Sequence, residues 1–417
     1  MRRLCTIAAI AWLLVAPATA GQPLGMRNPQ VSPANASAGL PASDDNLAAG
    51  GYPIAGGICA EWGHQVPCNN HYSTVRASTK YVSASDGMFT SVTANFQAMG
   101  SGNGSLIEES GINLALWARD LTQSGTWIAI TMTAAKNAVG IDGAANSATT
   151  LTSTSAAGTI LQSLTQASAA YTYTVYVKGV TVTGAIQVAD YPVLTPAFTT
   201  LSSANCFNPA GTGVAPASGQ AGFLRCTVTA TSLNPVIGFK FANSGDSIVV
   251  DFNQLEAAGF GTSPILTTSA TAARSADNIS LAGMAKTAMQ GTSFSTVIQT
   301  NGSVGSSGIL EGSADDILRL ETATSLRSTF GITTLTAVFG SGSYVGLAKN
   351  GLSVGPSTRS LVVNNGTVVT DTTAISANTV FTLGSFNGSS IFLDAYFPRI
   401  TFWSNKVPDV SLKAFTQ

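Results

Sequence analysis

Charged side chains are scarce in this sequence. They make up 9% of the 417 residues, with a formal net charge of −1, whereas about 25% is typical of globular proteins. No basic block stands out, so the electrostatic footprint of a nucleic-acid-binding protein is missing and no nucleic-acid partner is expected. Ser, Thr, Gly, Ala and Val fill the chain instead, and Thr and Val favour the half-buried surfaces of β-sheets.

The sequence also lacks an apolar run of the roughly 20 residues that a membrane-spanning helix needs. A shorter run from Ile7 to Val15 follows two arginines and precedes small residues that end at Ala20. This layout predicts a secretory signal peptide over residues 1–20; the alternative is a buried N-terminal helix. We therefore expect a secreted protein, extracellular or periplasmic, with no membrane span.

Cysteine is rare too. Four cysteines remain after the predicted cleavage, namely Cys59, Cys68, Cys206 and Cys226. An even number in an exported chain indicates disulfides, and three pairings are possible. We expect the local one, Cys59–Cys68 with Cys206–Cys226, because it closes the shortest loops.

The two histidines offer a different interpretation of the first cysteine pair. Cys59, His64, Cys68 and His71 could form a tetrahedral zinc site, but their spacing matches no common zinc module. Because no other histidine exists, a Ser-His-Asp triad in the later part of the chain has no base.

Acidic residues provide no clear catalytic pair. Glycosidases need two carboxylates about 5–10 Å apart. The neighbours Glu108 and Glu109 would point to opposite faces of a strand, and Asp315-Asp316 follow a Gly-Ser turn. We expect a non-enzyme; the alternative is a glycoside hydrolase or polysaccharide lyase.

Composition divides the chain. Residues 21–70 are rich in Pro, Gly, Ala, Ser and Asn and predict a flexible linker with a cysteine loop. Residues 71–110 contain short apolar pieces between turn signals, which predict a short β lead-in. Beyond them, many short strands and turns and no long amphipathic helix indicate β-sandwiches over 111–282 and 283–417.

The alternation within Tyr171–Val177 predicts a strand with tyrosines and valines on one face and Thr172, Thr174 and Tyr176 on the other. Ile237, Phe239 and Phe241 form a second alternating set, and Ile248, Val250 and Phe252 form a third. After Phe252 the period slips, which predicts a bulge near Asn253-Gln254 or the end of the strand.

Three short signals lie near the C-terminus. Asn350-Gly351 and Asn365-Gly366 predict two tight hairpins, because this dipeptide supplies positive φ angles. Pro408-Asp409 predicts a short helix reaching Phe415.

Seven segments in order resemble the carbohydrate-binding-module-like region of tailed-phage and prophage structural proteins, such as tail fibre and head-spike proteins. They span about half the chain and include Thr74–Val82 with Ser85-Asp-Gly87, Gly104–Glu109, Asn113–Leu121 with Trp127, Tyr173–Lys178, Gly245–Val250, Gln254–Gly259 and Arg274–Asp277. Residues 291–405 are similar, more faintly, to a concanavalin-like (laminin-G-type) sandwich.

The resemblance implies an all-β fold of two consecutive antiparallel β-sandwiches of jelly-roll type, after the lead-in and linker. It also implies a protein that binds carbohydrate or a cell surface, on the virion surface if the protein is phage-derived. The alternative is a structural subunit of a homo-oligomeric fibre or spike, for example a trimer.

Sugar sites stack aromatic side chains on apolar sugar faces. Trp127, Tyr176 and Tyr191 are the expected ligand-binding residues; Tyr176 shares its face with threonines and Tyr191 follows Asp190 in an expected loop. Because such modules often carry a structural calcium ion, Glu109, Asp251 and Glu256 are its expected oxygen ligands, unless they are solvated or hydrogen-bonded. No other cofactor is expected.

Overall fold

The computed structural model describes residues 45–47, 58–61, 64–67, 72–83, 87–96, 98–100, 104–192, 197–302, 307–313, 317–322, 325–330, 333–338, 346–373, 378–385 and 395–417. The predicted signal peptide lies outside these residues. The Cys59–Cys68 pairing and the alternative zinc set also depend on side chains outside the description, so they stay predictions.

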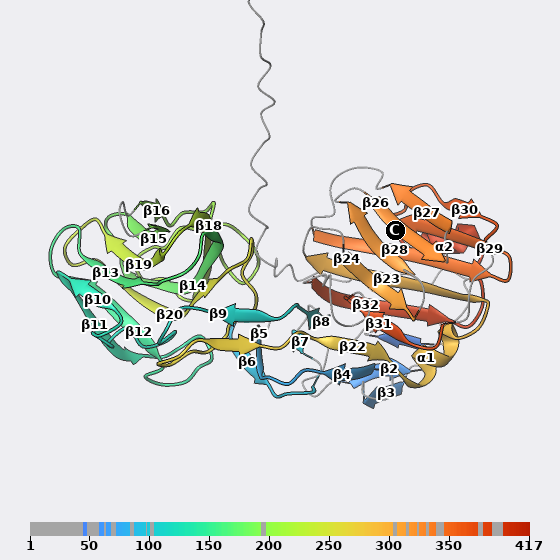
Figure 1. Ribbon diagram of the computed structural model, residues 1–417, viewed down its shortest axis with the longest axis horizontal. Helices are drawn as coiled ribbons and strands as arrows, with labels where there is room; N and C mark the ends of the chain where they lie inside the picture. Colours follow the sequence, from blue (N-terminus) through green and yellow to red (C-terminus); the bar gives the residue numbers. More distant parts are fainter. Residues whose placement is uncertain are drawn as a thin grey trace, which may run out of the picture.

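The described chain is almost entirely antiparallel β-structure, as predicted, and forms two lobes (Figure 1). The first lobe packs a five-stranded sheet on a six-stranded sheet. In sheet order the five strands are β10 (Ile128–Ile130), β13 (Thr159–Ser163), β19 (Pro235–Phe241), β15 (Ile186–Pro192) and β16 (Phe198–Thr200). The six are β11 (Met132–Ala138), β12 (Ala148–Ser153), β20 (Ser247–Glu256), β14 (Ala169–Thr181), β18 (Leu224–Ser232) and β17 (Cys206–Phe207).

The core between these sheets follows the predicted alternation. Ile237, Phe239 and Phe241 of β19 pack against Tyr173 and Val175 of β14 in one apolar cluster. The predicted Cys206–Cys226 disulfide is confirmed and joins β17 to β18 inside this core.

The second lobe packs a ten-stranded sheet on a seven-stranded sheet. The larger sheet runs β3 (His64–Pro67), β2 (Ile58–Glu61), β1 (Asp45–Leu47), β32 (Ala395–Trp403), β23 (Phe294–Gly302), β28 (Gly346–Gly355), β29 (Thr358–Val363) and β30 (Val369–Asp371), with β7 (Met99–Gly100) and β8 (Gly104–Ile107) joined to β32. The smaller runs β27 (Thr333–Val338), β26 (Ser325–Phe330), β25 (Leu318–Thr322), β24 (Ser307–Gly312), β31 (Phe381–Leu383), β22 (Asn278–Leu281) and β4 (Tyr72–Val75).

This topology differs from the predicted one, in which a linker and a β lead-in precede two consecutive sandwiches. Strands β1 to β3, from the expected linker, and β4, β7 and β8, from the expected lead-in, are hydrogen-bonded into the second lobe. Strand β22, expected at the end of the first sandwich, pairs with β4 and β31 there as well. The first lobe is therefore inserted between strands of the second.

Two small sheets lie between the lobes (Figure 1): β5 (Lys80–Ser83) with β6 (Phe89–Val92), and β9 (Gly111–Asn113) with β21 (Ala272–Arg274). The β5–β6 hairpin contacts both lobes. Val82 packs with Leu106 and Tyr396 of the second lobe, whereas Phe89 packs with Tyr176 and Phe252 of the first.

Two seven-residue helices complete the described elements, and none of these helices is long and apolar enough to span a membrane. The predicted C-terminal helix is confirmed as α2 (Asp409–Phe415). Helix α1 (Gly283–Met289) lies at the start of the second predicted sandwich.

Candidate functional site

The outer surface of the six-stranded sheet, which we call the closed face, is covered by other parts of the chain over its central strands β14 and β20. Tyr176 is 4% exposed because the Phe89 ring of the β5–β6 hairpin packs edge-on against it, with ring centroids 5.0 Å apart. Burial raises the pKa of Tyr176, and Arg225 opposes this shift. The expectation that Tyr176 is exposed is therefore wrong: the alternation was right, but both faces of β14 are buried.

The predicted bulge in β20 shapes this face. Thr174 pairs with Gln254 but Tyr176 pairs with Asp251, so β20 has one extra residue here, and Phe252 takes a φ of 44°. The bulge lets Phe252 join the cluster under the β5–β6 hairpin.

Asp251, beside the bulge, is held by an arginine. Arg119 donates to both carboxylate oxygens, Nε to Oδ1 at 2.7 Å and Nη2 to Oδ2 at 2.9 Å, and it also pairs with Asp142 at 2.6 Å. Burial raises the pKa of Asp251 and Arg119 lowers it, with a net upward shift. The Arg119 guanidinium also stacks 4.4 Å from the centre of the Phe252 ring.

The segment after β20 also packs on the closed face. Thr172 donates to the carbonyl of Ala258 at 2.7 Å. Glu256 accepts from the amide and hydroxyl of Thr262, both at 2.7 Å. Burial raises the pKa of Glu256, against these hydrogen bonds and the Arg274 charge.

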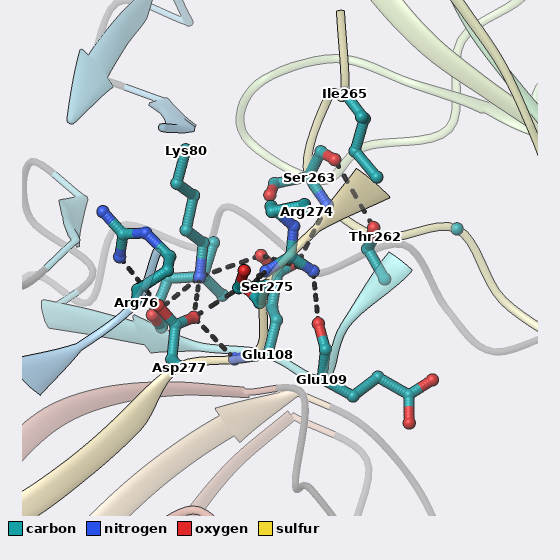
Figure 2. A network of polar contacts seen from close by, with 12 residues as sticks. Arg76, Lys80, Glu108, Glu109, Thr262, Ser263, Ile265, Arg274, Ser275 and Asp277 are labelled. Atoms are coloured by element: carbon teal, nitrogen blue, oxygen red, sulfur yellow. Dashed lines mark hydrogen bonds and ion pairs between the residues drawn. The ribbon is translucent and has the colours of Figure 1, made fainter. Parts of the chain in front are cut away.

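Next to this segment, between the lobes, lies a buried network of charges (Figure 2). Lys80 Nζ lies 2.5 Å from Asp277 Oδ2 and 2.9 Å from Glu108 Oε2, and Arg76 Nη1 lies 2.7 Å from Asp277 Oδ1. Arg274 Nη2 donates to the carbonyl of Glu109 at 2.6 Å and lies 3.8 Å from Glu108.

The network ties three distant parts of the sequence together. Burial alone would raise the pKa of Glu108, but Lys80 and Arg274 lower it to about 2. Glu108 Oε1 also accepts from the Ser263 amide of the segment on the closed face. Since Arg76, Lys80, Glu108 and Asp277 are all fully buried, this arrangement holds the lobes together and presents nothing to a ligand.

The outer surface of the five-stranded sheet is different, and we call it the open face. One cross-strand row contains Ile128, Leu161, Gly238, Ala189 and Phe198, each paired in register with the next. Ile128 is 54% exposed, and Leu161 and Phe198 are half-exposed, with two small buried residues between them.

The neighbouring row of the open face is mostly polar. It contains, in register, Ile130, Thr159, Lys240, Gln187 and Thr200, all of them at least partly exposed. Gln187 Nε2 donates to Thr200 Oγ1 at 3.4 Å. Lys240 Nζ lies 4.9 Å from the centre of the Phe198 ring, so an ammonium group, an amide and an aromatic ring are next to one another.

Position 238 of the open face accepts only glycine. Its φ is +131°, and a Cβ there would lie 2.1 Å from the backbone oxygen of Ile160. Only glycine adopts such a conformation without strain. Gly238 therefore keeps the space between Leu161 and Ala189 free of any side chain.

The structure buries two of the three predicted ligand-binding residues. Trp127 is 1% exposed, packs in the core of the first lobe and donates Nε1–H to the carbonyl of Leu116, so stacking on a ligand is excluded for it as for Tyr176. Tyr191 lies in β15 rather than in a loop, paired with Val236; its side chain lies outside the description, so its role stays a prediction.

The three predicted calcium ligands do not form a cluster. Asp251 is bound by Arg119 and Glu256 by Thr262, while Glu109 is half-buried near Arg274. Among the described residues, no group of three or more acidic, His or Cys side chains could hold a metal ion. The side chains of Asp251 and Glu256 are thus hydrogen-bonded, as the alternative expected.

Sequence reasoning missed Phe198, Gln187 and Lys240. The pattern of β19 was recognised from its core residues, and the same alternation places Lys240, between Phe239 and Phe241, on the outer side. Phe198 had no comparable signal, because its strand has three residues.

No family model matches the chain, and no curated protein does. Solved structures show a partial likeness. The CBM40 of Ruminococcus gnavus IT-sialidase, bound to α2,6 sialyllactose, is 17% identical over 32% of this chain and 88% of its own, with a TM-score of 0.26. The binding domain of botulinum neurotoxin DC, in complex with SialylT, is 9% identical over 34% of this chain and 39% of its own, with a TM-score of 0.26.

Trypanosoma rangeli sialidase, in complex with the inhibitor DANA, is 8% identical over 65% of this chain and 60% of its own, with a TM-score of 0.27. At these values the likenesses carry no argument about function, and the site must be judged from its own geometry.

Proposed function

We propose that this chain is a secreted, non-catalytic glycan-binding protein, and that the open face of its first lobe is the recognition surface. The observation that carries the proposal is the half-buried Phe198 ring beside the amide of Gln187 and the ammonium group of Lys240. Aromatic surface with a few placed polar groups is what sugar recognition requires.

The contrast between the two faces supports this choice. The closed face also combines an aromatic ring with charged groups, namely Tyr176, Asp251 and Arg119. However, Phe89 packs against Tyr176, and Arg119 binds Asp251. The open face instead leaves Phe198, Lys240 and Gln187 accessible from outside.

The second lobe has a supporting role in this proposal. Its sheets include β4, β8 and β22, which flank the first lobe in sequence, and the Lys80–Asp277 ion pair lies at the junction. A surface held in this way keeps a fixed orientation to the rest of the protein, as an exported appendage or a homo-oligomeric fibre would need.

A glycan array probed with the full chain and with the Phe198→Ala variant tests the proposal. Loss of stacking should lower binding to the best glycans about tenfold, since a well-placed ring contributes about 1 kcal/mol or more beyond its hydrogen-bonding neighbours. Phe96→Ala is the matched control, because Phe96 is 66% exposed and lies outside both faces. Absence of any glycan binding, or equal binding by wild type and Phe198→Ala, would reject the proposal.

A further inference from the structure

The open face carries little charge, as does the rest of the chain. Among the residues of its five strands only Lys240 and Asp190 are charged. Asp190 pairs in register with Ile237, a core residue, rather than with the row that contains Lys240. The described side chains of the open face therefore carry one charge, and it is positive.

Lys240 also differs from Arg119 and Lys136, two other cations of the same lobe. Arg119 is paired with Asp142 and Asp251, and Lys136 lies 3.5 Å from Asp120. No described carboxylate lies within ion-pair distance of Lys240, whose ammonium group lies over the Phe198 ring. Its three N–H donors are available to an outside acceptor.

Resting on the proposed function, we infer that the open face selects anionic glycans, with Lys240 binding the carboxylate or sulfate group of a sugar that contacts Phe198. A cation beside an aromatic surface gives an acidic sugar both an apolar contact and a charge-assisted hydrogen bond. A neutral sugar would have to displace water from an ammonium group without replacing its charge interaction, which disfavours it.

The test uses an array of paired glycans on the full chain. Each uronate-containing or sialylated glycan is printed beside its carboxyl-reduced form, and each sulfated glycan beside its desulfated form. We expect the anionic member of the bound pairs to give the stronger signal. The carboxylate and sulfate pairs show which of the two groups is preferred.

Titration calorimetry on the best pair then assigns the preference to one residue. Lys240→Met should weaken binding of the anionic glycan about tenfold, as expected for loss of a hydrogen bond to a charged group, and leave the neutral one nearly unchanged. Lys240→Arg, which keeps the charge, should retain the preference. Lys178→Met is the matched control, since Lys178 is half-exposed on β14 of the other sheet.

The outcomes separate the inference from the function on which it rests. Phe198-dependent binding that is equal within each pair, or unaffected by Lys240→Met, overturns the inference and leaves glycan binding standing. Binding that is absent or independent of Phe198 overturns both.

Discussion

Glu108 shows at the scale of one residue how this chain uses its few charges. It is fully buried, yet its pKa is lowered to about 2 because Lys80 and Arg274 outweigh the effect of burial. Its carboxylate therefore stabilises the fold fully above its ordinary pKa of 4.5, and this contribution is lost as the pH falls from 4.5 toward 2. At about 1.4 kcal/mol for each pKa unit, the effect is about 3 kcal/mol.

We predict that Glu108→Gln lowers the free energy of unfolding at pH 7 by about 3 kcal/mol and flattens its decline in acid. Urea denaturation between pH 2.5 and 7 measures both. Glu109→Gln is the control: burial raises the pKa of Glu109, so its ionisation opposes folding and its removal should not flatten the acid decline. An unchanged acid slope in Glu108→Gln would contradict this assignment.

Tyr176 gives a second prediction at this scale. Because it is enclosed by Phe89 and Phe252, Tyr176→Ala should cost about 3–5 kcal/mol of stability, while the folded protein binds glycans as the wild type does. Thermal unfolding together with the glycan array checks both parts. Lost glycan binding at wild-type stability would mean that the closed face opens to ligands.

Among the elements, local patterns predicted what depends on neighbours in sequence. A hairpin forms at Asn365-Gly366, since β29 pairs with β30, but the positive φ angles fall at Asn364 and Asn365 rather than at Asn365 and Gly366. The turn predicted at Asn350-Gly351 is wrong, because β28 continues through these residues. The Asn350 side chain donates to the Ile298 carbonyl, and Leu412 of α2 lies against Gly351.

Those contacts come from residues more than 50 positions away, which no local pattern contains. The same limit explains the closed face. Period-2 alternation identified the outward side of β14, but whether that side meets water depends on β6, about 85 residues earlier in the chain.

At the same scale we predict that Gly238→Ala destabilises the first lobe by about 3 kcal/mol. Alanine would need a φ of +131° and would place its Cβ against the Ile160 oxygen. Gly222→Ala is the control, since nothing lies within 4 Å of its Cβ position, and its effect should stay within about 0.5 kcal/mol. Equal stability of the two variants in chemical denaturation would refute the role given to Gly238.

Over the whole molecule, the sequence predicted the fold class but not how its parts combine. Tyr72, Ile107 and Ile279 belong to the core of the second lobe although they lie outside 283–417. Strands β4 and β22 pair across about 200 residues and β8 and β32 across about 290, and such register is set by the assembled sheet rather than by any segment. For the same reason the sequence did not predict that Phe198 and Lys240 lie next to each other.

We predict that residues 111–277 fold alone, whereas residues 283–417 do not, because the latter lack β4, β8 and β22. Circular dichroism with thermal melting of the two fragments checks this: a cooperative transition is expected only for the first. A cooperative β-sheet melt of residues 283–417 alone would show that the N-terminal strands are dispensable.

The central claim is that one face of the first lobe recognises glycans and the other does not. Calorimetry with the best array glycan, comparing Phe198→Ala on the open face with Phe207→Ala, tests it most directly, since Phe207 is a half-exposed phenylalanine of the six-stranded sheet. We expect Phe198→Ala to weaken binding about tenfold and Phe207→Ala to leave it unchanged. Loss of binding in Phe207→Ala with full binding in Phe198→Ala would contradict the account.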